Sequence, residues 1–350
     1  MSHALHLDAS NPADLSRAVN MLRAGRLVAF ATETVYGLGA NALSPEAVAG
    51  IFAAKQRPSW DPLIVHLASA EQLSSVAQVP AELAQRIAAL AKAFWPGPLT
   101  LLLPRSAAVP DAVTAGRKLV GVRVPAHPAA HALLAAVGLP IAAPSANLFG
   151  HTSPTTAAHV LADLEGRIDA VLDAGPTYIG LESSVVDPTQ TPMVLYRPGA
   201  VTAEQLTAVT GVAVEVFLPN PAAAQSDHPA SMPSPGVGIR HYAPRARMAL
   251  VAGSAAALND ALQAALQQAG SNAPSASVGV LLPVGWALPG DAILQPWGRW
   301  DDPKGLAATL FAGLRALDDR GVSLILCPLP EPGGIADAIR DRLQKAARST

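Results

Sequence analysis

Segments typical of β-strands alternate with segments typical of helices along most of this 350-residue chain, and a proline-rich stretch interrupts the alternation once. The stretch, residues 218–246, shows no apolar periodicity. Such a segment cannot bury enough apolar surface to fold alone. The sequence therefore predicts two α/β domains, residues 1–217 and 247–350, joined by a linker at 218–246 that could also act as a lid.

The N-terminal domain alternates irregularly, which favours a mixed sheet. Residues 27–31 form a short apolar strand, and Ser44 and Pro45 mark the start of a helix. That helix ends near Lys55, because Arg57 precedes a proline and is pushed towards an extended conformation. We also expect strands near residues 63–67, 100–103, 119–124, 141–143, 170–172, 184–186 and 194–196, a helix at 81–94, and a helix to about residue 164 capped by Ser153.

The C-terminal domain alternates more regularly. Strands are expected at 248–251, 278–282 and 322–327, and helices at 255–269 behind Ser254, at 303–319 behind Asp302, and at 335–347. Regular strand–helix alternation is typical of a parallel sheet. We expect a smaller, Rossmann-like parallel α/β domain.

Composition and charge exclude several classes of protein. Half of the residues are hydrophobic and 14% are charged, as in a folded protein and unlike a disordered one. The net charge of −2, nearly balanced in both domains, gives no general attraction to nucleic acid or to an anionic membrane. The single cysteine, Cys327, precludes an intrachain disulfide and indicates a small buried hydrophobe. The chain shows no secretory signal pattern, and we expect a cytoplasmic protein.

Gly37 and Gly39 belong to a G-x-G-x-x-A pattern after a strand, which on paper matches a dinucleotide-binding fingerprint. The next helix, however, begins at Pro45 behind its own cap, so the glycines do not lead directly into a helix N-terminus. We therefore do not favour a nicotinamide site. The sequence has no G-x-x-x-x-G-K-[ST] motif, so an ATP site here would not be a P-loop.

Two cations, Lys55 and Arg57, leave the end of the first helix together. They could be ordinary capping charges, since cations complement the helix dipole there. His66 lies in an apolar strand, where a histidine is more often a satisfied core residue. Arg123 lies in L-V-G-V-R-V and needs an anionic partner, which is either a bound anion or a structural ion pair. The occurrence of these four residues together favours an anion-binding site.

Hydroxyl and amide side chains lie on loops further along the chain. Ser145 and Asn147, in P-S-A-N, precede Ser153-Pro154, and this pattern could cradle a phosphate. Ser153 could equally be only a helix cap. Ser183 and Arg197 close short segments bounded by glycine and proline, where functional loops tend to lie.

Together these motifs resemble the YrdC-like family in order and spacing: T-E-T-V-Y-G-L-G, K-x-R-P, the histidine after P-L-I-V, P-S-A-N, L-E-S-S-V-V-D and R-P-G. The S-P-G…R-H-Y-A-P strap followed by an α/β domain is similar to the long, two-domain form of that family. The resemblance covers nearly the whole chain, most specifically residues 32–66 and 143–198.

The resemblance implies a nucleotidyltransferase, an L-threonylcarbamoyladenylate synthase. Such an enzyme condenses L-threonine, bicarbonate or CO₂, and ATP to threonylcarbamoyl-AMP and pyrophosphate, with Mg²⁺ carried by ATP. Its product feeds the machinery that forms threonylcarbamoyladenosine at position 37 of tRNA. The strap at 234–244 would then close over the labile intermediates.

The resemblance also assigns roles to residues. The threonine-binding positions are Thr34, His66, Arg123, Ala143 and Ser183, with Arg123 taking the carboxylate. The catalytic tetrad around the triphosphate is Lys55, Arg57, Ser145 and Asn147. Further ATP contacts are Asp61, Leu119, Ser153, Arg197 and His241. Two positions depart from the family: Ala31 replaces a common proline, and Asp61 replaces a common asparagine. A carboxylate at 61 would repel phosphates unless Mg²⁺ or the neighbouring cations compensate.

Two alternatives come from other classes. The first is a tRNA- or RNA-binding module without adenylation activity, which the balanced charge and the 4% aromatic content disfavour. The second is an enzyme that uses carbamoyl phosphate, but the chain lacks the zinc-finger and acylphosphatase-like segments of such proteins.

Overall fold

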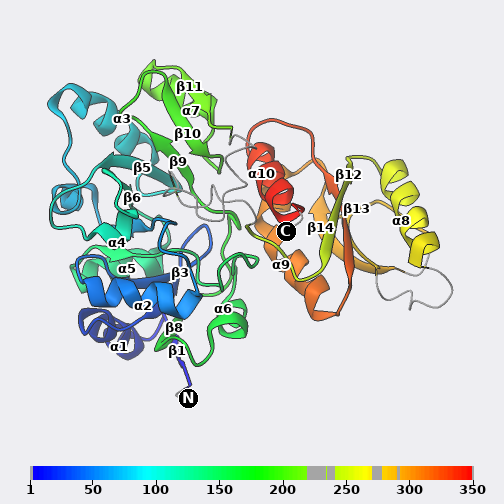
Figure 1. The fold of residues 1–350 in the computed structure, drawn as a ribbon, viewed down its shortest axis with the longest axis horizontal. Helices are drawn as coiled ribbons and strands as arrows, with labels where there is room; N and C mark the ends of the chain where they lie inside the picture. Colours follow the sequence, from blue (N-terminus) through cyan, green and yellow to red (C-terminus); the bar gives the residue numbers. More distant parts are fainter. Residues whose placement is uncertain (1–2, 219–233, 235–240, 270–277, 290–291, 349–350) are drawn as a thin grey trace. The chain divides into compact units, whose positions relative to one another are not determined.

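The computed structural model describes residues 3–218, 234, 241–269, 278–289 and 292–348. The chain divides into two compact units (Figure 1). The first consists of Met1–Phe149, Ser153–Tyr178 and Glu182–Gly238, and the second of Gly150–Thr152, Ile179–Leu181 and Ile239–Thr350. The three-part division with boundaries at residues 217 and 246 stays a prediction.

Within the described residues of the first unit, eleven strands form one sheet. They are β1 (Leu5–Asp8), β2 (Val28–Ala31), β3 (Tyr36–Asn41), β4 (Ile64–His66), β5 (Leu99–Pro104), β6 (Leu119–Arg123), β7 (Ile141–Ala142), β8 (Ala170–Asp173), β9 (Ser184–Asp187), β10 (Met193–Arg197) and β11 (Val214–Val216). Their order is β1-β8-β2-β3-β7-β4-β6-β5-β9-β10-β11. The β4–β6 pair is parallel and the β2–β3 pair antiparallel, so the predicted mixed sheet is confirmed.

Helices pack against both faces of this sheet. They are α1 (Pro12–Arg23), α2 (Pro45–Lys55), α3 (Ala84–Phe94), α4 (Asp111–Thr114), α5 (Pro128–Val137), α6 (Ala157–Leu164) and α7 (Ala203–Thr210). Successive residues of a strand point to opposite faces. Val28 and Phe30 of β2 therefore pack in one core with α1 and α5, while Ala29 and Ala31 pack in a second core with α2 and α6.

The side chains of His66 and Arg123 lie on the α1/α5 face, further along the sheet. Ile64, Leu102 and Val185 form a small apolar cluster there. His66 is two residues from Ile64 in β4 and therefore points to the same face. Arg123 pairs in register with His66 across β4 and β6, which brings the two side chains together.

The start of α2 agrees with the sequence prediction, whereas the start of α6 corrects it. Ser44 caps α2 by accepting a hydrogen bond from the Ala47 amide, and the helix ends at Lys55. The expected Ser153 cap is wrong, because Thr156 caps α6. The Ser153 hydroxyl instead donates to a buried carboxylate of Glu182.

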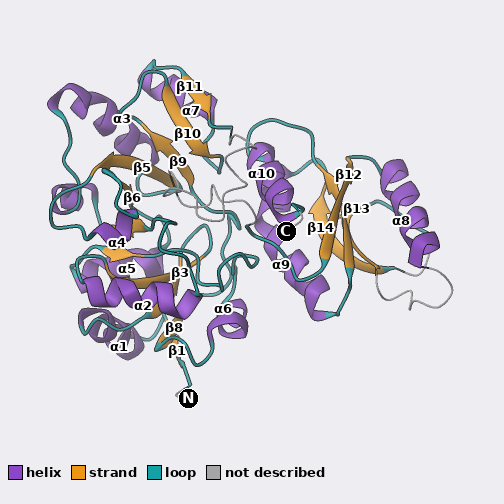
Figure 2. Ribbon diagram, viewed as in Figure 1, coloured by secondary structure: helices purple, strands orange, loops and turns teal. Residues whose placement is uncertain are grey.

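In the second unit, the described residues form a four-stranded parallel sheet with helices on both sides (Figure 2). Its elements are β12 (Arg247–Ala252), α8 (Ala255–Ala269), β13 (Val278–Val284), β14 (Ile293–Arg299), α9 (Pro303–Asp319), β15 (Leu324–Leu329) and α10 (Ala336–Ala346). The strand order β12-β15-β13-β14 confirms the predicted parallel α/β domain. Asp302 caps α9 as predicted. Strand β14 was not expected from the sequence. Cys327 is fully buried, as expected of a small hydrophobe.

Two short segments from the middle of the chain belong to the second unit. The Gly150 carbonyl accepts a hydrogen bond from the Ala243 amide at 2.9 Å. The Thr152 carbonyl accepts one from Arg315. Gly180 has a φ of +76°, and a Cβ there would lie 2.5 Å from the Ala307 carbonyl oxygen.

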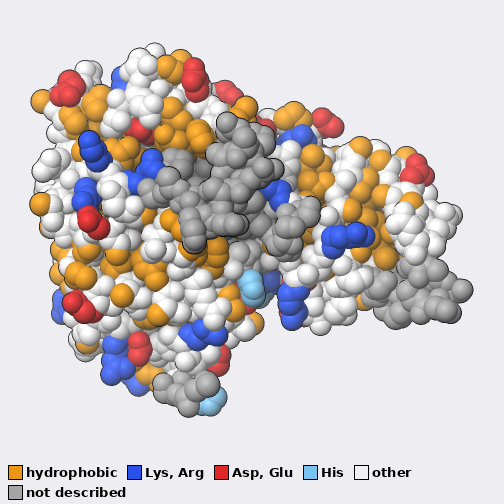
Figure 3. Space-filling view, in the orientation of Figure 1, with side chains coloured by type: hydrophobic (Ala, Val, Ile, Leu, Met, Phe, Trp, Pro, Cys, Tyr) orange, Lys and Arg blue, Asp and Glu red, His pale blue; other side chains and the backbone are white. Residues whose placement is uncertain are grey.

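No helix among the described residues is both long and apolar enough to cross a membrane. On the face shown in Figure 3, basic and acidic side chains are interspersed with hydrophobic and uncharged ones.

Candidate functional site

The T-E-T-V segment is the turn of the β2–β3 hairpin. The Thr32 hydroxyl donates to the Val35 carbonyl at 2.7 Å and lies 2.8 Å from the Thr34 hydroxyl. Thr32, Glu33 and Thr34 are at most 2% exposed. The turn therefore places two hydroxyls and a carboxylate inside the protein, where each needs a polar partner.

Arg123, at the end of β6, supplies partners for this turn. Its Nη1 donates to the Thr34 hydroxyl at 3.0 Å, and its Nε donates to the Gly97 carbonyl at 3.1 Å. Its Nη2 lies 2.6 Å from Glu33 Oε1 in a buried ion pair. The structural ion pair that the sequence offered as one possibility is therefore present. The other possibility, a bound anion, stays a prediction, and Thr34 beside the guanidinium is one of the predicted substrate contacts.

Glu33 was not among the residues singled out from the sequence. Burial raises its pKa, but the Arg123 guanidinium and backbone hydrogen bonds together outweigh burial and hold the pKa below its usual value. The available signal was the position of Glu33 between two threonines in an apolar hairpin, because a buried carboxylate requires a cation. Arg123, which the sequence showed to need an anion, is the cation that pairs with this carboxylate.

His66 lies beside Arg123, with its ring edge-on to Phe30 at 6.3 Å between centroids. Burial, followed by repulsion from Arg123, lowers the pKa of His66 to about 3. The imidazole is therefore neutral at physiological pH. Its buried Nδ1 has no hydrogen-bond partner among the described residues.

Lys55 holds the P-S-A-N loop. Its Nζ, which is buried, donates to the carbonyls of Ser145 at 2.6 Å and Asn147 at 2.5 Å. The loop is also tied to β3, since the Ala146 amide donates to the Tyr36 carbonyl at 2.8 Å. Burial and then Arg57 lower the pKa of Lys55 well below its usual value. The structure thus brings together three members of the predicted tetrad.

Arg57, the fourth member, pairs with Asp61. Arg57 Nη2 lies 2.9 Å from Asp61 Oδ2, and both side chains are 3% exposed. The guanidinium also donates to the carbonyls of Asp61 and Pro62, at 3.1 and 2.7 Å. The carboxylate that replaces the family's asparagine is therefore compensated by an adjacent cation.

Ser183 and Arg197 form a second polar group. Arg197 donates to the Ser183 carbonyl and hydroxyl, at 3.0 and 3.1 Å, and the Ser183 hydroxyl lies 2.8 Å from that of Thr100. The chain after Arg197 passes close to β9. A Cβ at Gly199 would lie 2.4 Å from the Ser184 amide nitrogen, so only glycine fits without a shift.

Other predicted residues take different places. The Ala143 amide donates to the Ile64 carbonyl at 2.9 Å, which joins the P-S-A-N segment to the His66 strand. Leu119 begins β6 and is half-buried, four residues before Arg123. His241 is buried but belongs to the second unit. Most of the strap predicted at 234–244, residues 235–240, lies outside the described residues.

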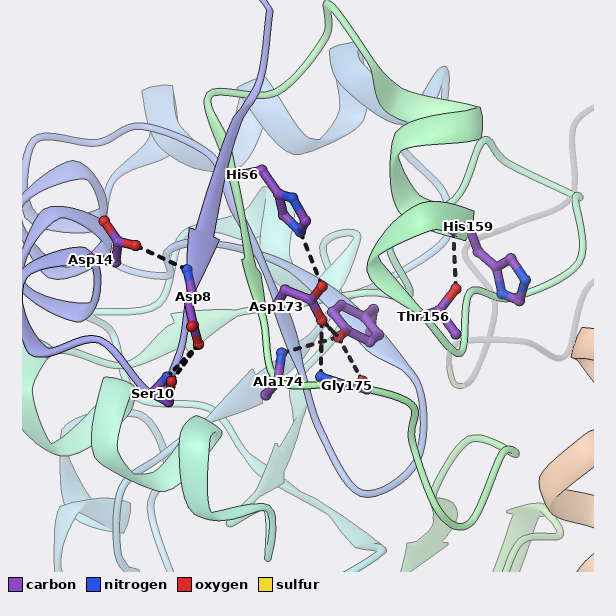
Figure 4. A network of polar contacts seen from close by, with 10 residues as sticks. His6, Asp8, Ser10, Asp14, Thr156, His159, Asp173, Ala174 and Gly175 are labelled. Carbon is purple, nitrogen blue, oxygen red and sulfur yellow. Dashed lines mark hydrogen bonds and ion pairs between the residues drawn. The ribbon is translucent and has the colours of Figure 1, made fainter.

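Tyr36 anchors the far end of the T-E-T-V turn. Its hydroxyl lies 2.9 Å from Asp173 Oδ1 and 2.7 Å from the Gly175 carbonyl oxygen, and its one proton can be donated to either of them. His6 reaches Asp173 from β1, as Figure 4 shows. Burial raises the pKa of Tyr36, so its hydroxyl stays a donor. The hydroxyl of this tyrosine thus links the hairpin to the end of β8. It makes no hydrogen bond to Lys55, Arg57 or Arg123 among the contacts described.

In the described part of the chain, no three histidine, cysteine, aspartate or glutamate side chains gather in a group that could hold a metal ion. The geometry instead offers buried cations, hydroxyls and a neutral imidazole. Such a set can bind and orient anionic and zwitterionic ligands.

Comparisons with known proteins extend over both units. A family model of Sua5, YciO and YrdC proteins, described as telomere recombination, matches residues 20–199. A second model, described as the C-terminal domain of threonylcarbamoyl-AMP synthase, matches residues 201–348. Threonylcarbamoyl-AMP synthase of Pyrococcus abyssi is 42% identical to this chain, covering 94% of the chain and 93% of the relative.

A second relative and a solved structure agree. Threonylcarbamoyl-AMP synthase of Bacillus subtilis is 42% identical, covering 97% of this chain and 94% of the relative. The crystal structure of P. abyssi Sua5 complexed with L-threonine matches with a TM-score of 0.85 and 39% identity, covering 99% of this chain and 98% of that one.

Proposed function

Because this chain belongs to the threonylcarbamoyl-AMP synthase family, we propose that its first unit condenses L-threonine, bicarbonate or CO₂, and ATP to threonylcarbamoyl-AMP and pyrophosphate. The protein is thus an enzyme of the nucleotidyltransferase type. The observation that carries the proposal is the buried contact of Arg123 with Thr34 beside neutral His66. A guanidinium, a hydroxyl and an imidazole suit the carboxylate and polar groups of a hydroxy amino acid.

Threonine binds at this end of the site. Arg123 takes the carboxylate, and His66 offers its Nδ1, which has no hydrogen-bond partner among the described residues. Thr34, Ala143 and Ser183 complete the proposed threonine contacts. A solved relative, P. abyssi Sua5 complexed with L-threonine, supports this assignment.

ATP binds along the cationic end. The proposed contacts in the first unit are Lys55, Arg57, Asp61, Leu119, Ser145, Asn147, Ser153 and Arg197. His241, which the resemblance also implies, belongs to the second unit. Lys55 fixes the loop that carries Ser145 and Asn147. Phosphate charge favours the protonated form of Lys55, against the burial that lowers its pKa.

The chemistry needs alignment more than a protein nucleophile. The threonine amine adds to CO₂, forming a C–N bond and releasing a proton, and gives a carbamate. A carbamate oxygen then attacks the α-phosphorus of ATP, whose bond to the bridging oxygen breaks as pyrophosphate leaves. Two unit charges about 4 Å apart repel by about 4 kcal/mol at an effective dielectric of about 20, and buried cations offset that repulsion.

Mg²⁺ is proposed to arrive on the ATP phosphates, since the described residues offer no cluster of metal ligands. No step above depends on that ion. The product would pass to tRNA threonylcarbamoyl-transfer machinery, and the strap at 234–244 would close over the carbamate during the reaction.

The deciding experiment is pyrophosphate release from ATP with threonine and bicarbonate omitted in turn. Release that requires both co-substrates supports the proposal. Release that ignores threonine would show an ATPase or another transferase. ATP binding without release, together with salt-sensitive tRNA binding, would favour an RNA-binding module.

A further inference from the structure

Glu33 lies at the centre of the charged and titratable groups around the threonine end of the site. Arg123 reaches it from β6, and His66, His127 and Tyr178 interact with it electrostatically. The side chain of Glu33 is 1% exposed and that of Arg123 is 4% exposed. A buried pair of this kind is costly to desolvate, and removal of either charge leaves the other uncompensated.

Arg123 makes three interactions that fix its guanidinium, and the ion pair with Glu33 is one of them. Nε is held by Gly97, Nη1 by Thr34, and Nη2 by Glu33. The orientation of the guanidinium therefore depends on the turn that Glu33 belongs to. Nη2 of Arg123 lies 2.6 Å from Oε1 of Glu33, so the two opposite charges are in direct contact.

Resting on the proposed function, we propose that Glu33 is a positioning and specificity-determining residue, which balances the charge of Arg123 so that the site accepts a zwitterionic amino acid and discriminates against a simple carboxylate. The ion pair has no net charge, so it provides no net electrostatic attraction that would offset the burial of a ligand with a net charge. A ligand that brings both an ammonium and a carboxylate keeps the site neutral. Without Glu33, the site would carry an uncompensated positive charge and would attract anions non-selectively.

The test compares binding of two ligands without ATP by calorimetry. L-threonine carries both charges, whereas (R)-β-hydroxybutyrate has the same carboxylate and hydroxyl but no amino group. In Glu33→Gln, the ratio of threonine affinity to hydroxybutyrate affinity should fall at least about tenfold relative to wild type, the effect of one buried charge contact. Glu204→Gln, an exposed glutamate in the first turn of α7, is the matched control and should leave the ratio unchanged.

A merely structural role predicts a different result. If Glu33 only supports the turn, both affinities should fall together and the ratio should stay within about threefold, which would overturn the inference. The conservative variant Glu33→Asp keeps the charge and should retain the wild-type ratio even if both affinities drop. A shift of the ratio in Glu33→Asp as large as in Glu33→Gln would also overturn it.

Wild-type protein provides a measurement that does not depend on a variant that folds. At pH 5, binding of hydroxybutyrate should take up more protons than binding of threonine, once the protons that the hydroxybutyrate carboxyl itself loses on binding are subtracted, because an added anion favours protonation of Glu33. Titrations in two buffers with different heats of ionisation measure this uptake. Equal uptake for both ligands would contradict the inference. Failure of wild type to bind threonine at all would instead contradict the proposed function.

Discussion

At the scale of single residues, each cation of the site is already held by protein oxygens. Arg123 pairs with Glu33, Arg57 pairs with Asp61, and Lys55 donates to two loop carbonyls. These cations are therefore oriented before any ligand arrives. Oriented charges stabilise a transition state without reorganising during the reaction, which is the main source of electrostatic catalysis.

Replacement of either cation at the ATP end should impair catalysis strongly. Lys55→Ala frees two loop carbonyls and removes a charge, and Arg57→Ala leaves Asp61 buried without its ion-pair partner. Each variant should lower turnover at least roughly 10²-fold, the scale of one lost preorganised contact. Steady-state pyrophosphate release measures the effect. Exposed Lys92→Ala is the control, and wild-type turnover in both site variants would contradict the assigned role.

His66 should make the protein less stable as pH falls. Its folded pKa is about 3, below the ordinary value of 6.5, so between these limits the unfolded chain binds a proton that the folded chain does not. The free energy of unfolding therefore falls as pH drops through this window, by about 1.4 kcal/mol per pH unit well below 6.5. The lowered pKa of Glu33 adds a loss only below about pH 4.5.

The window between pH 6.5 and 4.5 isolates the histidines. In His66→Gln the fall in unfolding free energy across this window should be shallower, with a remainder from His127, whose pKa burial also lowers. Urea unfolding at several pH values measures the slope. Exposed His131→Gln serves as the control. A His66→Gln slope equal to that of wild type would contradict the assigned neutral state.

At the scale of elements, the sequence was informative where one local signal sufficed. Helices α2 and α9 begin behind Ser44 and Asp302 as predicted, because a capping side chain and a following proline are local features. β3 was missed, since its glycines suggested a loop. Gly39 is required by contacts with neighbouring strands, because a Cβ there would lie 2.8 Å from the Phe30 ring in β2 and 3.1 Å from the Ile141 side chain in β7.

The site was predicted through separate motifs, but their pairing was not. The sequence showed that Arg123 needs an anion, yet Glu33 lies ninety residues earlier, and only the β2–β3 turn brings it to β6. Likewise, Ser153 had the local pattern of a cap and instead binds Glu182. Such partners depend on tertiary contacts that a single sequence does not reveal.

The loop after β10 should be sensitive to a single methyl group. In Gly199→Ala, the new Cβ would meet the backbone of Ser183 and Ser184, which cannot move aside without shifting β9 or the loop. We expect a loss of about 1–3 kcal/mol in stability and a lower kcat/KM, because the shift would displace Arg197 from Ser183. Thermal unfolding and steady-state kinetics measure the two effects.

Gly50→Ala is the matched control for this element. Gly50 lies inside α2, and its nearest neighbours are side-chain atoms of Leu27 at 3.4 Å and beyond. Alanine favours a helix over glycine by about 0.5–1 kcal/mol, so this variant should be as stable as wild type or more stable. If Gly199→Ala behaved like Gly50→Ala, close approach of the loop to β9 would not be important.

At the scale of the whole molecule, the chain enters the second unit three times. Residues 150–152 and 179–181 belong to that unit, although residues on both sides of each segment belong to the first. Asn147 and Ser153 flank the first segment, and Glu182 and Ser183 follow the second. The second unit thus holds the chain at points adjacent in sequence to loops of the proposed site.

This connectivity predicts that the two units unfold in one cooperative transition, because loss of the second unit releases both segments and with them the ends of the site loops. Gly180→Ala tests the prediction: φ is +76° there, and a Cβ would lie 2.5 Å from the Ala307 carbonyl oxygen, so we expect a loss of about 2 kcal/mol. Calorimetry should show a single transition that moves as a whole to lower temperature.

Gly138→Ala in the first unit, where φ is +70° and a Cβ meets nothing within 4 Å, should move the same transition by less. Two separate transitions, only one of which responds to Gly180→Ala, would show instead that the units unfold independently and that the site loops do not depend on the second unit for their stability.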